Sequence, residues 1–161
     1  DGSGYKDNIG AAAVLFCAGK MPRTLRYCLG TREEHTIFEA EEVGLTLTAH
    51  LLATERDLLF PLSISIDNKA SILAGENFHS RPGSYLADNF RRMMKKIARD
   101  HANFDVTVCW VPGHSGVHGN EEANKHAKSA AEGINNNSPT NHLPRYLRDR
   151  PLPLSVLALR E

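Results

Sequence analysis

The order of the predicted elements indicates a single α/β domain. Two strand-like segments separated by a turn come first, at 10–16 and 24–29, and they are typical of an antiparallel hairpin. Helix and strand patterns then follow one another along the chain, as in folds that pack helices on a sheet. With 161 residues, of which 41% are hydrophobic, the chain can bury one core but is short for two.

Local signals place the first elements. Gly19 and Pro22 mark the turn between the two strands. Thr36 and Glu39 have the spacing of a capping box, in which each side chain satisfies a free backbone N–H of the other residue. We therefore expect a helix to begin there and to run to about Ala53.

The later elements follow from their periodicity. Residues 62–67 alternate apolar and polar side chains as a strand does, and the residues after them suit a short helix. A break at 81–83 precedes a helical pattern at 85–101, and 105–111 is a further strand. A last helix is expected at 120–132. The predicted order is β-β-α-β-α-α-β-α.

The composition changes near residue 135. We expect residues 1–134 to form the domain, whereas 135–161, rich in asparagine, proline and basic residues, indicates a linker or extended tail. No apolar run approaches the roughly 18 residues of a membrane span, and no signal peptide is visible. These features favour a monomeric intracellular protein of the cytoplasm or nucleus, without a membrane partner.

Cysteine usage and charge exclude some function classes. The three cysteines form no Cys-x-x-Cys pair and lie in apolar or strand-like stretches, which argues for buried thiols in a reducing compartment and against disulfides and zinc. The 19 basic residues balance the 19 acidic ones, so bulk charge does not indicate a nucleic-acid partner. Any such partner must be argued from local sites.

Three carboxylates lie in positions typical of ligand-binding groups. Asp1 is followed at once by glycine, which lets backbone come close to a ligand, although an Asp-Gly pair is usually a turn. Glu41 falls on the apolar stripe of the long helix, where a charge is costly unless compensated; the alternative is a solvated margin. Asp67 ends an apolar strand before a helix, and it would also serve as that helix's N-cap.

The chemistry of this set favours a hard cation. Carboxylates from separate elements, without a cluster of histidine or cysteine, are typical of Mg²⁺ sites rather than zinc sites. Mg²⁺ usually takes its remaining ligands from water and phosphate, which suggests phosphoryl chemistry. His114 lies between glycines on the loop before the last helix, where it could move a proton near neutral pH or be only a surface residue.

Four segments in this order resemble the type 1 ribonuclease H family, including the ribonuclease H domains of reverse transcriptases, from residue 1 to about 133. They are Asp1-Gly-Ser, Glu39-Ala-Glu-Glu-Val-Gly-Leu, Ser65-Ile-Asp-Asn and Trp110-Val-Pro-Gly-His-Ser-Gly-Val-His-Gly-Asn-Glu. The amino-acid sequences of several segments and of the tail resemble, more narrowly, those of domains in fungal non-LTR retrotransposon polyproteins.

The resemblance implies a fold, an activity and a set of site residues. The fold would be ribonuclease H-like, with a five-stranded mixed sheet flanked by helices and a truncated first strand. The activity would be hydrolysis of the RNA strand of RNA/DNA hybrids, giving 5′-phosphate products, within a larger reverse transcriptase polyprotein. Asp1, Glu41 and Asp67 would ligate two Mg²⁺ ions, for which Mn²⁺ can substitute, and His114 would assist proton transfer or product release.

This sequence departs from the family pattern at the fourth carboxylate. Ten residues beyond His114 stands Asn124, whose amide oxygen can ligate or position a metal-bound water but brings no charge. Together with the clipped first strand, this departure leaves open a weakened or non-catalytic nucleic-acid-binding domain. A DNA exonuclease or resolvase of the same fold is a third possibility, because fold alone does not determine substrate.

Substrate contacts are expected at two places. The resemblance places Gly2, Ser3 and Glu41 near the 2′-hydroxyl that distinguishes RNA from DNA. The helix at 85–101 carries basic side chains that could neutralise phosphates, although a solvated helix face is the alternative. These side chains are Arg91, Arg92, Lys95, Lys96 and Arg99.

Overall fold

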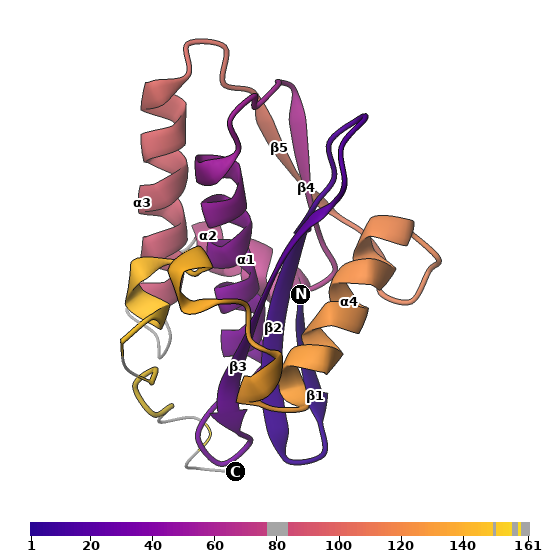
Figure 1. Cartoon of the computed structure of the whole chain (residues 1–161), viewed down its shortest axis with the longest axis vertical. Coiled ribbons are helices and arrows are strands. Elements are labelled where there is room, and N and C mark those ends of the chain that lie inside the picture. The colour runs from indigo at the N-terminus through magenta and orange to yellow at the C-terminus, as the bar shows by residue number, and fades with distance from the viewer. Residues whose placement is uncertain (77–83, 150, 156–157, 159–161) are drawn as a thin grey trace.

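Five strands and four helices make up the regular structure of the described residues, followed by three short 3₁₀ helices (Figure 1). The computed structural model describes residues 1–76, 84–149, 151–155 and 158. The elements are β1 (Gly2–Tyr5), β2 (Asn8–Leu15), β3 (Arg23–Thr31), α1 (Ile37–Thr54), β4 (Leu62–Ile66), α2 (Lys69–Glu76), α3 (Ser84–Asp100), β5 (Val106–Trp110) and α4 (His118–Ala131). The predicted α/β class is confirmed, and the predicted break at 81–83 lies outside the described residues.

The strands form two hydrogen-bonded groups instead of one continuous sheet. Strands β1, β2 and β3 pair antiparallel in that order, whereas β4 and β5 pair in parallel. Strand β1 is four residues long and therefore pairs with β2 only over residues 8–11. Beyond that point the free edge of β2 faces β4 across a cleft. The expected single five-stranded sheet is therefore corrected to a three-stranded and a two-stranded group.

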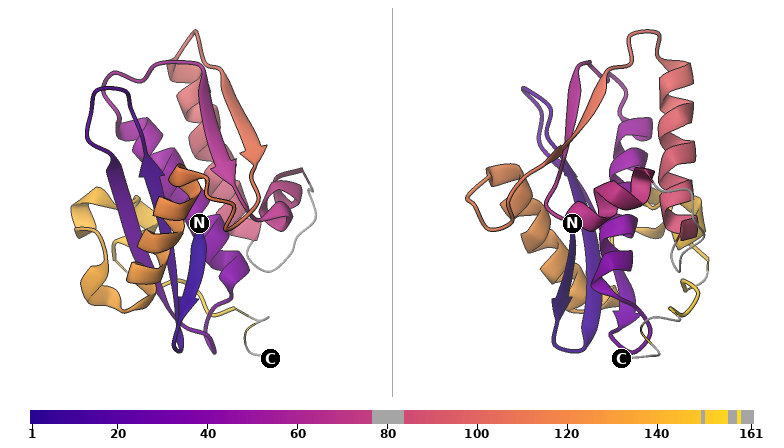
Figure 2. Two further views of the ribbon diagram at one scale, coloured as in Figure 1. Left: turned by 90° about the vertical axis from the view of Figure 1, so that its right-hand side faces the viewer. Right: turned by 180° about the vertical axis from the view of Figure 1, so that it is seen from behind.

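Helices cover both faces of the antiparallel strands. In Figures 1 and 2, α1 lies on one face with α3 beside it, and α4 lies on the other. The middle strand suits this arrangement because its residues are small. A Cβ on Gly10 would lie 2.3 Å from the backbone N of Ala131 in α4, so only glycine permits the approach. Ala11 and Ala12 beside it are fully buried.

The capping box predicted for the long helix is present. Thr36 Oγ1 accepts a hydrogen bond from the Glu39 backbone N–H at 3.2 Å, and Glu39 Oε2 accepts one from the Thr36 N–H at 2.8 Å. Helix α1 then runs to Thr54, one residue beyond the predicted end. The helix is buried on more than one side, because sheet, α3 and the C-terminal segment all pack on it. Glu42, displaced from the predicted apolar stripe, is consequently only 1% exposed.

Two apolar clusters fill the interior and share α1. The first joins β2, β3 and α1 through residues such as Ile9, Leu47 and Leu51. The second lies under the parallel pair, where Ile64 and Ile66 of β4 pack with α1 and α3. Helix α1 therefore holds both groups of strands in place, and this determines which side chains at the ends of the strands lie close together.

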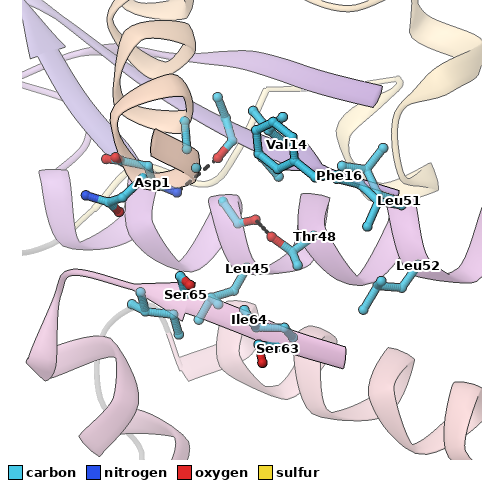
Figure 3. Close-up of a pocket in the computed structure, with 18 of the residues that line it drawn as sticks. Asp1, Val14, Phe16, Leu45, Thr48, Leu51, Leu52, Ser63, Ile64 and Ser65 are labelled. Atoms are coloured by element: carbon cyan, nitrogen blue, oxygen red, sulfur yellow. Dashed lines mark hydrogen bonds between the residues drawn. The ribbon is translucent and has the colours of Figure 1, made fainter. Parts of the chain in front are cut away.

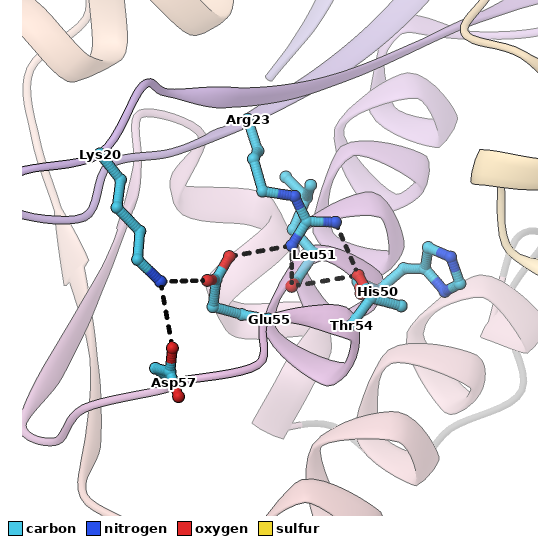
Figure 4. Close-up of polar contacts among 7 residues, drawn as sticks. All are labelled: Lys20, Arg23, His50, Leu51, Thr54, Glu55 and Asp57. Carbon is cyan, nitrogen blue, oxygen red and sulfur yellow. Dashed lines mark hydrogen bonds and ion pairs between the residues drawn. The ribbon is translucent and has the colours of Figure 1, made fainter.

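An ionic network attaches the β2–β3 hairpin to the end of α1 (Figure 4). Glu55 accepts from Lys20 Nζ and from Arg23 Nη1, each at 3.0 Å. Arg23 also donates to Thr54 Oγ1 at 2.9 Å. Hydrogen bonds from Arg23 and Lys20 lower the pKa of the Glu55 carboxyl. The hairpin that forms the rim of the cleft is thus held by one side chain from its turn and one from β3.

The segment after Gly133 packs on the domain instead of extending away from it. Its leucines at 143, 147 and 152 are buried in the first apolar cluster, and Tyr146 hydrogen-bonds Thr46 of α1. Near the end of the segment, the Ser155 N–H donates to the Glu34 carbonyl at 2.8 Å. The expectation of an extended tail is corrected for its described part, since three leucines spaced among prolines supply enough apolar surface to dock it. Among the described helices, none has the length and apolarity that a bilayer crossing requires.

Candidate metal centre

Three carboxylates from separate elements converge at the start of β1. Asp1 precedes β1, Glu41 lies in the second turn of α1, and Asp67 follows β4. Each offers an oxygen, and these oxygens all lie within 4.8 Å of one another. The sequence-predicted carboxylate set is therefore brought together in space.

The simpler interpretation of each carboxylate is wrong. Asp1-Gly2 does not form a turn, because Gly2 begins strand β1. Glu41 is 6% exposed and so does not lie at a solvated margin. The cap at the start of α2 comes from Asn68, whose Oδ1 accepts from the Ala70 N–H at 2.9 Å, which leaves the Asp67 carboxylate for other partners.

Two glycines allow β1 and α1 to approach closely enough to form the cluster. A Cβ on Gly2 would lie 2.6 Å from the Glu41 backbone N, and one on Gly44 would lie 2.7 Å from the Asp1 N. Any larger residue at either position must push strand and helix apart. From the sequence, Gly2 was expected to let the backbone come close to a ligand. In the structure it instead lets helix α1 come close to strand β1.

The electrostatics of the cluster are unbalanced. Burial raises the pKa of Glu41, and the neighbouring Asp67 raises it further, while a hydrogen bond from the Gly2 backbone partly offsets both effects. The Asp1 backbone N donates to the Ala12 carbonyl at 2.9 Å. Within the described ranges, no Lys or Arg forms an ion pair with the three carboxylates.

An orphaned oxygen shows that the cluster fits a cation. Asp1 Oδ2 is buried and lacks a hydrogen-bond partner. A buried carboxylate oxygen is costly without a donor or a cation. Three carboxylates at this spacing, with no histidine or cysteine ligand, match the oxygen ligands that Mg²⁺ and Mn²⁺ prefer.

The surroundings of Asp67 include a residue that the sequence analysis did not single out. Asn120, in the first turn of α4, donates from Nδ2 to Asp67 Oδ2 at 3.3 Å and is only 6% exposed. The Trp110 indole N–H donates to the Asp67 carbonyl at 3.0 Å. Asn120 lies within the segment that carries the family resemblance, but nothing in the sequence indicates which group it contacts.

The cluster lies at one end of a cleft of about 260 Å³ between β2, β4 and α1 (Figure 3). In Figure 3 Asp1 is at one end, whereas Leu51 and Leu52 lie toward the other. Most of the walls are apolar, with Val14 and Ile64 contributed by the facing strands. Two serines and a threonine also line the cleft, so the acidic end is its charged part rather than its only polar part among the described lining residues.

The other predicted site residues lie around the cluster without joining it. His114 is exposed, with φ of +54°, on the loop whose Gly113 approaches Asp67. Asn124 is half-buried on α4, one turn beyond Asn120, and does not line the cleft. Ser3 is buried at 8% exposure, so little of its side chain is open to a ligand.

The predicted basic helix is present as α3, which packs against α1. Arg91 Nη1 pairs with Asp88 at 2.9 Å, and Arg92 donates to Asn89. Lys95 and Lys96 are exposed. None of these four basic side chains lines the cleft, so a role in binding nucleic acid stays a prediction.

Comparison with known proteins does not assign the chain to a family. A scan against protein-family models finds no match, and a search of curated proteins finds none either. A proposal about function must therefore be argued from the carboxylate cluster and from the sequence itself.

Proposed function

We propose that this chain is a metal-dependent nuclease that hydrolyses the RNA strand of RNA/DNA hybrids. The observation that carries the proposal is the convergence of Asp1, Glu41 and Asp67, one of whose oxygens is orphaned. No Lys or Arg of the described residues forms an ion pair with any of these three carboxylates. The choice of hybrid as substrate depends on the four segments that resemble type 1 ribonuclease H. The resemblance and the cluster select the same three residues independently.

The three carboxylates would hold Mg²⁺. When bound, a pair of Mg²⁺ ions supplies the positive charge that activates water and stabilises the departing 3′ oxygen, with a 5′-phosphate left on the other product. Glu41 contributes from a buried position, which limits competition by bulk water, while Asp1 and Asp67 are half-exposed and reachable by a phosphodiester. His114, exposed on the loop whose Gly113 approaches Asp67, would exchange a proton near the leaving oxygen.

Substrate binding would combine backbone and phosphate contacts. Gly2, beside Glu41, remains a candidate for the 2′-hydroxyl, whereas the burial of Ser3 makes its hydroxyl a weaker candidate. The exposed Lys95 and Lys96 of α3 would add phosphate contacts that weaken as salt rises.

A second candidate function is a non-catalytic nucleic-acid-binding domain. Asn124 favours it, because an amide at the fourth position brings no charge and one cation would be held less tightly. In that case the cleft would bind nucleic acid without cleaving it, and the family resemblance would reflect binding only.

A cleavage assay separates the candidates. Labelled RNA/DNA hybrid, double-stranded RNA and single-stranded DNA are incubated with Mg²⁺ and the wild-type chain, Asp67→Asn, or Asp100→Asn as an exposed control. We expect cleavage of the hybrid alone, lost in Asp67→Asn and retained in Asp100→Asn. Hybrid binding without cleavage would support the second candidate. Cleavage of DNA but not hybrid, or full activity in Asp67→Asn, would refute the proposal.

A further inference from the structure

We propose that Asn120 is a positioning residue that fixes the Asp67 carboxylate for cation binding. This inference rests on the proposed metal centre and extends it to the helix on the opposite face of the sheet. Asn120 touches neither Asp1 nor Glu41 by any hydrogen bond in the described structure, so its role acts through Asp67.

The hydrogen bond joins two elements that are distant in the chain. Asn120 lies in the first turn of α4, 53 residues beyond Asp67, and its Nδ2 donates to Asp67 Oδ2 at 3.3 Å. A carboxylate with one oxygen held in this way rotates less freely about its last side-chain bond. The direction of both oxygens is thereby restricted before any cation arrives, which lowers the entropy lost on binding.

Separate contacts fix the backbone of Asp67. The Trp110 indole N–H donates to the Asp67 carbonyl at 3.0 Å, and the Val111 N–H donates to the Ile66 carbonyl at 2.9 Å. These bonds continue the β4–β5 pairing past the end of β4 but do not reach the carboxylate. Of the side-chain hydrogen bonds within the described residues, only that from Asn120 acts on the carboxylate itself.

The loop before α4 confines the same oxygen from another direction. A Cβ on Gly113 would lie 3.2 Å from Asp67 Oδ2, so the loop backbone approaches the carboxylate closely. Asp67 Oδ2 is therefore bracketed by Gly113 and Asn120.

The chemical type of Asn120 suits this task. A Lys or Arg at the same place would neutralise the charge that the cation needs, and an ionised Asp could not donate to a carboxylate. A neutral amide holds the oxygen and leaves most of its charge available. Its burial is consistent with this role, because a buried amide is costly unless its polar atoms are used.

The test measures Mn²⁺ binding directly, through the electron paramagnetic resonance signal of free Mn²⁺. The variants are Asn120→Ala, which keeps a good helix former, and Asn120→Leu, which keeps the volume without a donor. Asn103→Ala, at an exposed turn away from the cleft, is the matched amide control. We expect about 10-fold weaker Mn²⁺ binding in both Asn120 variants, the usual effect of losing a hydrogen bond to a metal ligand, and no change in Asn103→Ala.

Two comparisons make the outcomes distinguishable. If the wild-type chain does not bind Mn²⁺, or if Asp67→Asn binds it as well as the wild type does, the proposed metal centre is refuted and this inference with it. If the wild type binds and the Asn120 variants bind equally well, the positioning role alone is overturned. Cleavage as a function of Mn²⁺ concentration gives a second readout: a positioning defect shifts the half-saturating concentration, whereas a purely structural defect lowers the melting temperature and leaves that concentration unchanged.

Discussion

Replacing Gly2 by alanine tests whether close packing of β1 on α1 creates the metal centre. The new Cβ would lie 2.6 Å from the Glu41 backbone N, and 2.8 Å from both the Ala40 carbonyl carbon and its Cβ. Ordinary van der Waals contact begins near 3.4 Å, so strand and helix must separate by about 0.8 Å, the difference between 3.4 and 2.6 Å. The obstacle is mainly helix backbone, which cannot rotate away as a flexible side chain would.

The expected cost has two parts. Overpacking of this kind costs about 1–3 kcal/mol, and each kcal/mol lowers the melting temperature by roughly 2–4 °C for a chain of this size. The displacement also moves Asp1, next in the chain, away from Glu41. Because a carboxylate cluster binds a cation only when its oxygens converge, Mn²⁺ affinity should fall together with stability.

Thermal melting followed by circular dichroism, with and without Mn²⁺, measures both effects. The control is Gly119→Ala, whose Cβ would meet Phe16 at an ordinary 3.4 Å and whose helical position favours alanine. We expect Gly2→Ala to melt lower and to gain less stability from Mn²⁺, while the control does neither. A Gly2→Ala variant with wild-type melting and a wild-type Mn²⁺ response would refute the packing argument.

Three further predictions follow from burial and charge. Burial raises the pKa of Glu42 to about 7 from 4.5, so the free energy of unfolding should fall as pH rises through that interval, by on the order of 3 kcal/mol. When the free energy of unfolding is measured with urea at several pH values, Glu42→Gln should not show the decrease that Glu42 causes. Glu33→Gln, at an exposed site, should show the same decrease as the wild type. Leu147→Ala should lose about 2–5 kcal/mol in the same measurement, because Leu147 is 4% exposed in the first apolar cluster, and Leu154→Ala, at 58% exposure, should lose little. Asn124→Asp should lower the Mg²⁺ concentration needed for half-maximal hybrid cleavage; an unchanged value would mean that Asn124 is not the fourth ligand position.

Sequence reasoning succeeded where the signal is local. The capping box of Thr36 and Glu39 and the stripe that carries Glu41 depend on spacings of three or four residues, which the helix itself imposes. The local pattern does not indicate strand β1, which only the family resemblance implied as a truncated first strand, because two of its four residues are glycine, a poor strand former in isolation. Its conformation is fixed by pairing with β2 and by close packing on α1, and neither partner is visible in the local sequence.

The C-terminal segment shows a second limit of local patterns. Its buried leucines, Leu143, Leu147 and Leu152, are four and five residues apart, which sustains no single helical or strand period, and prolines interrupt them. Burial there depends on the side chains of α1 and of the antiparallel strands in the first apolar cluster, which come together only once the domain has folded. Asn120 is missed for the same reason, because its partner is 53 residues away and an amide at a helix start is usually a surface group.

The adjacent residues Glu41 and Glu42 show why the candidate metal ligand can be identified only from the three-dimensional structure. Both are buried and burial raises the pKa of both, so neither exposure nor pKa distinguishes a ligand from a structural carboxyl. They point to different sides of α1: the charges nearest Glu42 include Arg91 of α3, whereas those nearest Glu41 include Asp67. A carboxylate that folding places among other carboxylates must either take up a proton or be compensated by a cation, and this placement beside Asp1 and Asp67, rather than burial, is why we propose Glu41 and not Glu42 as a metal ligand.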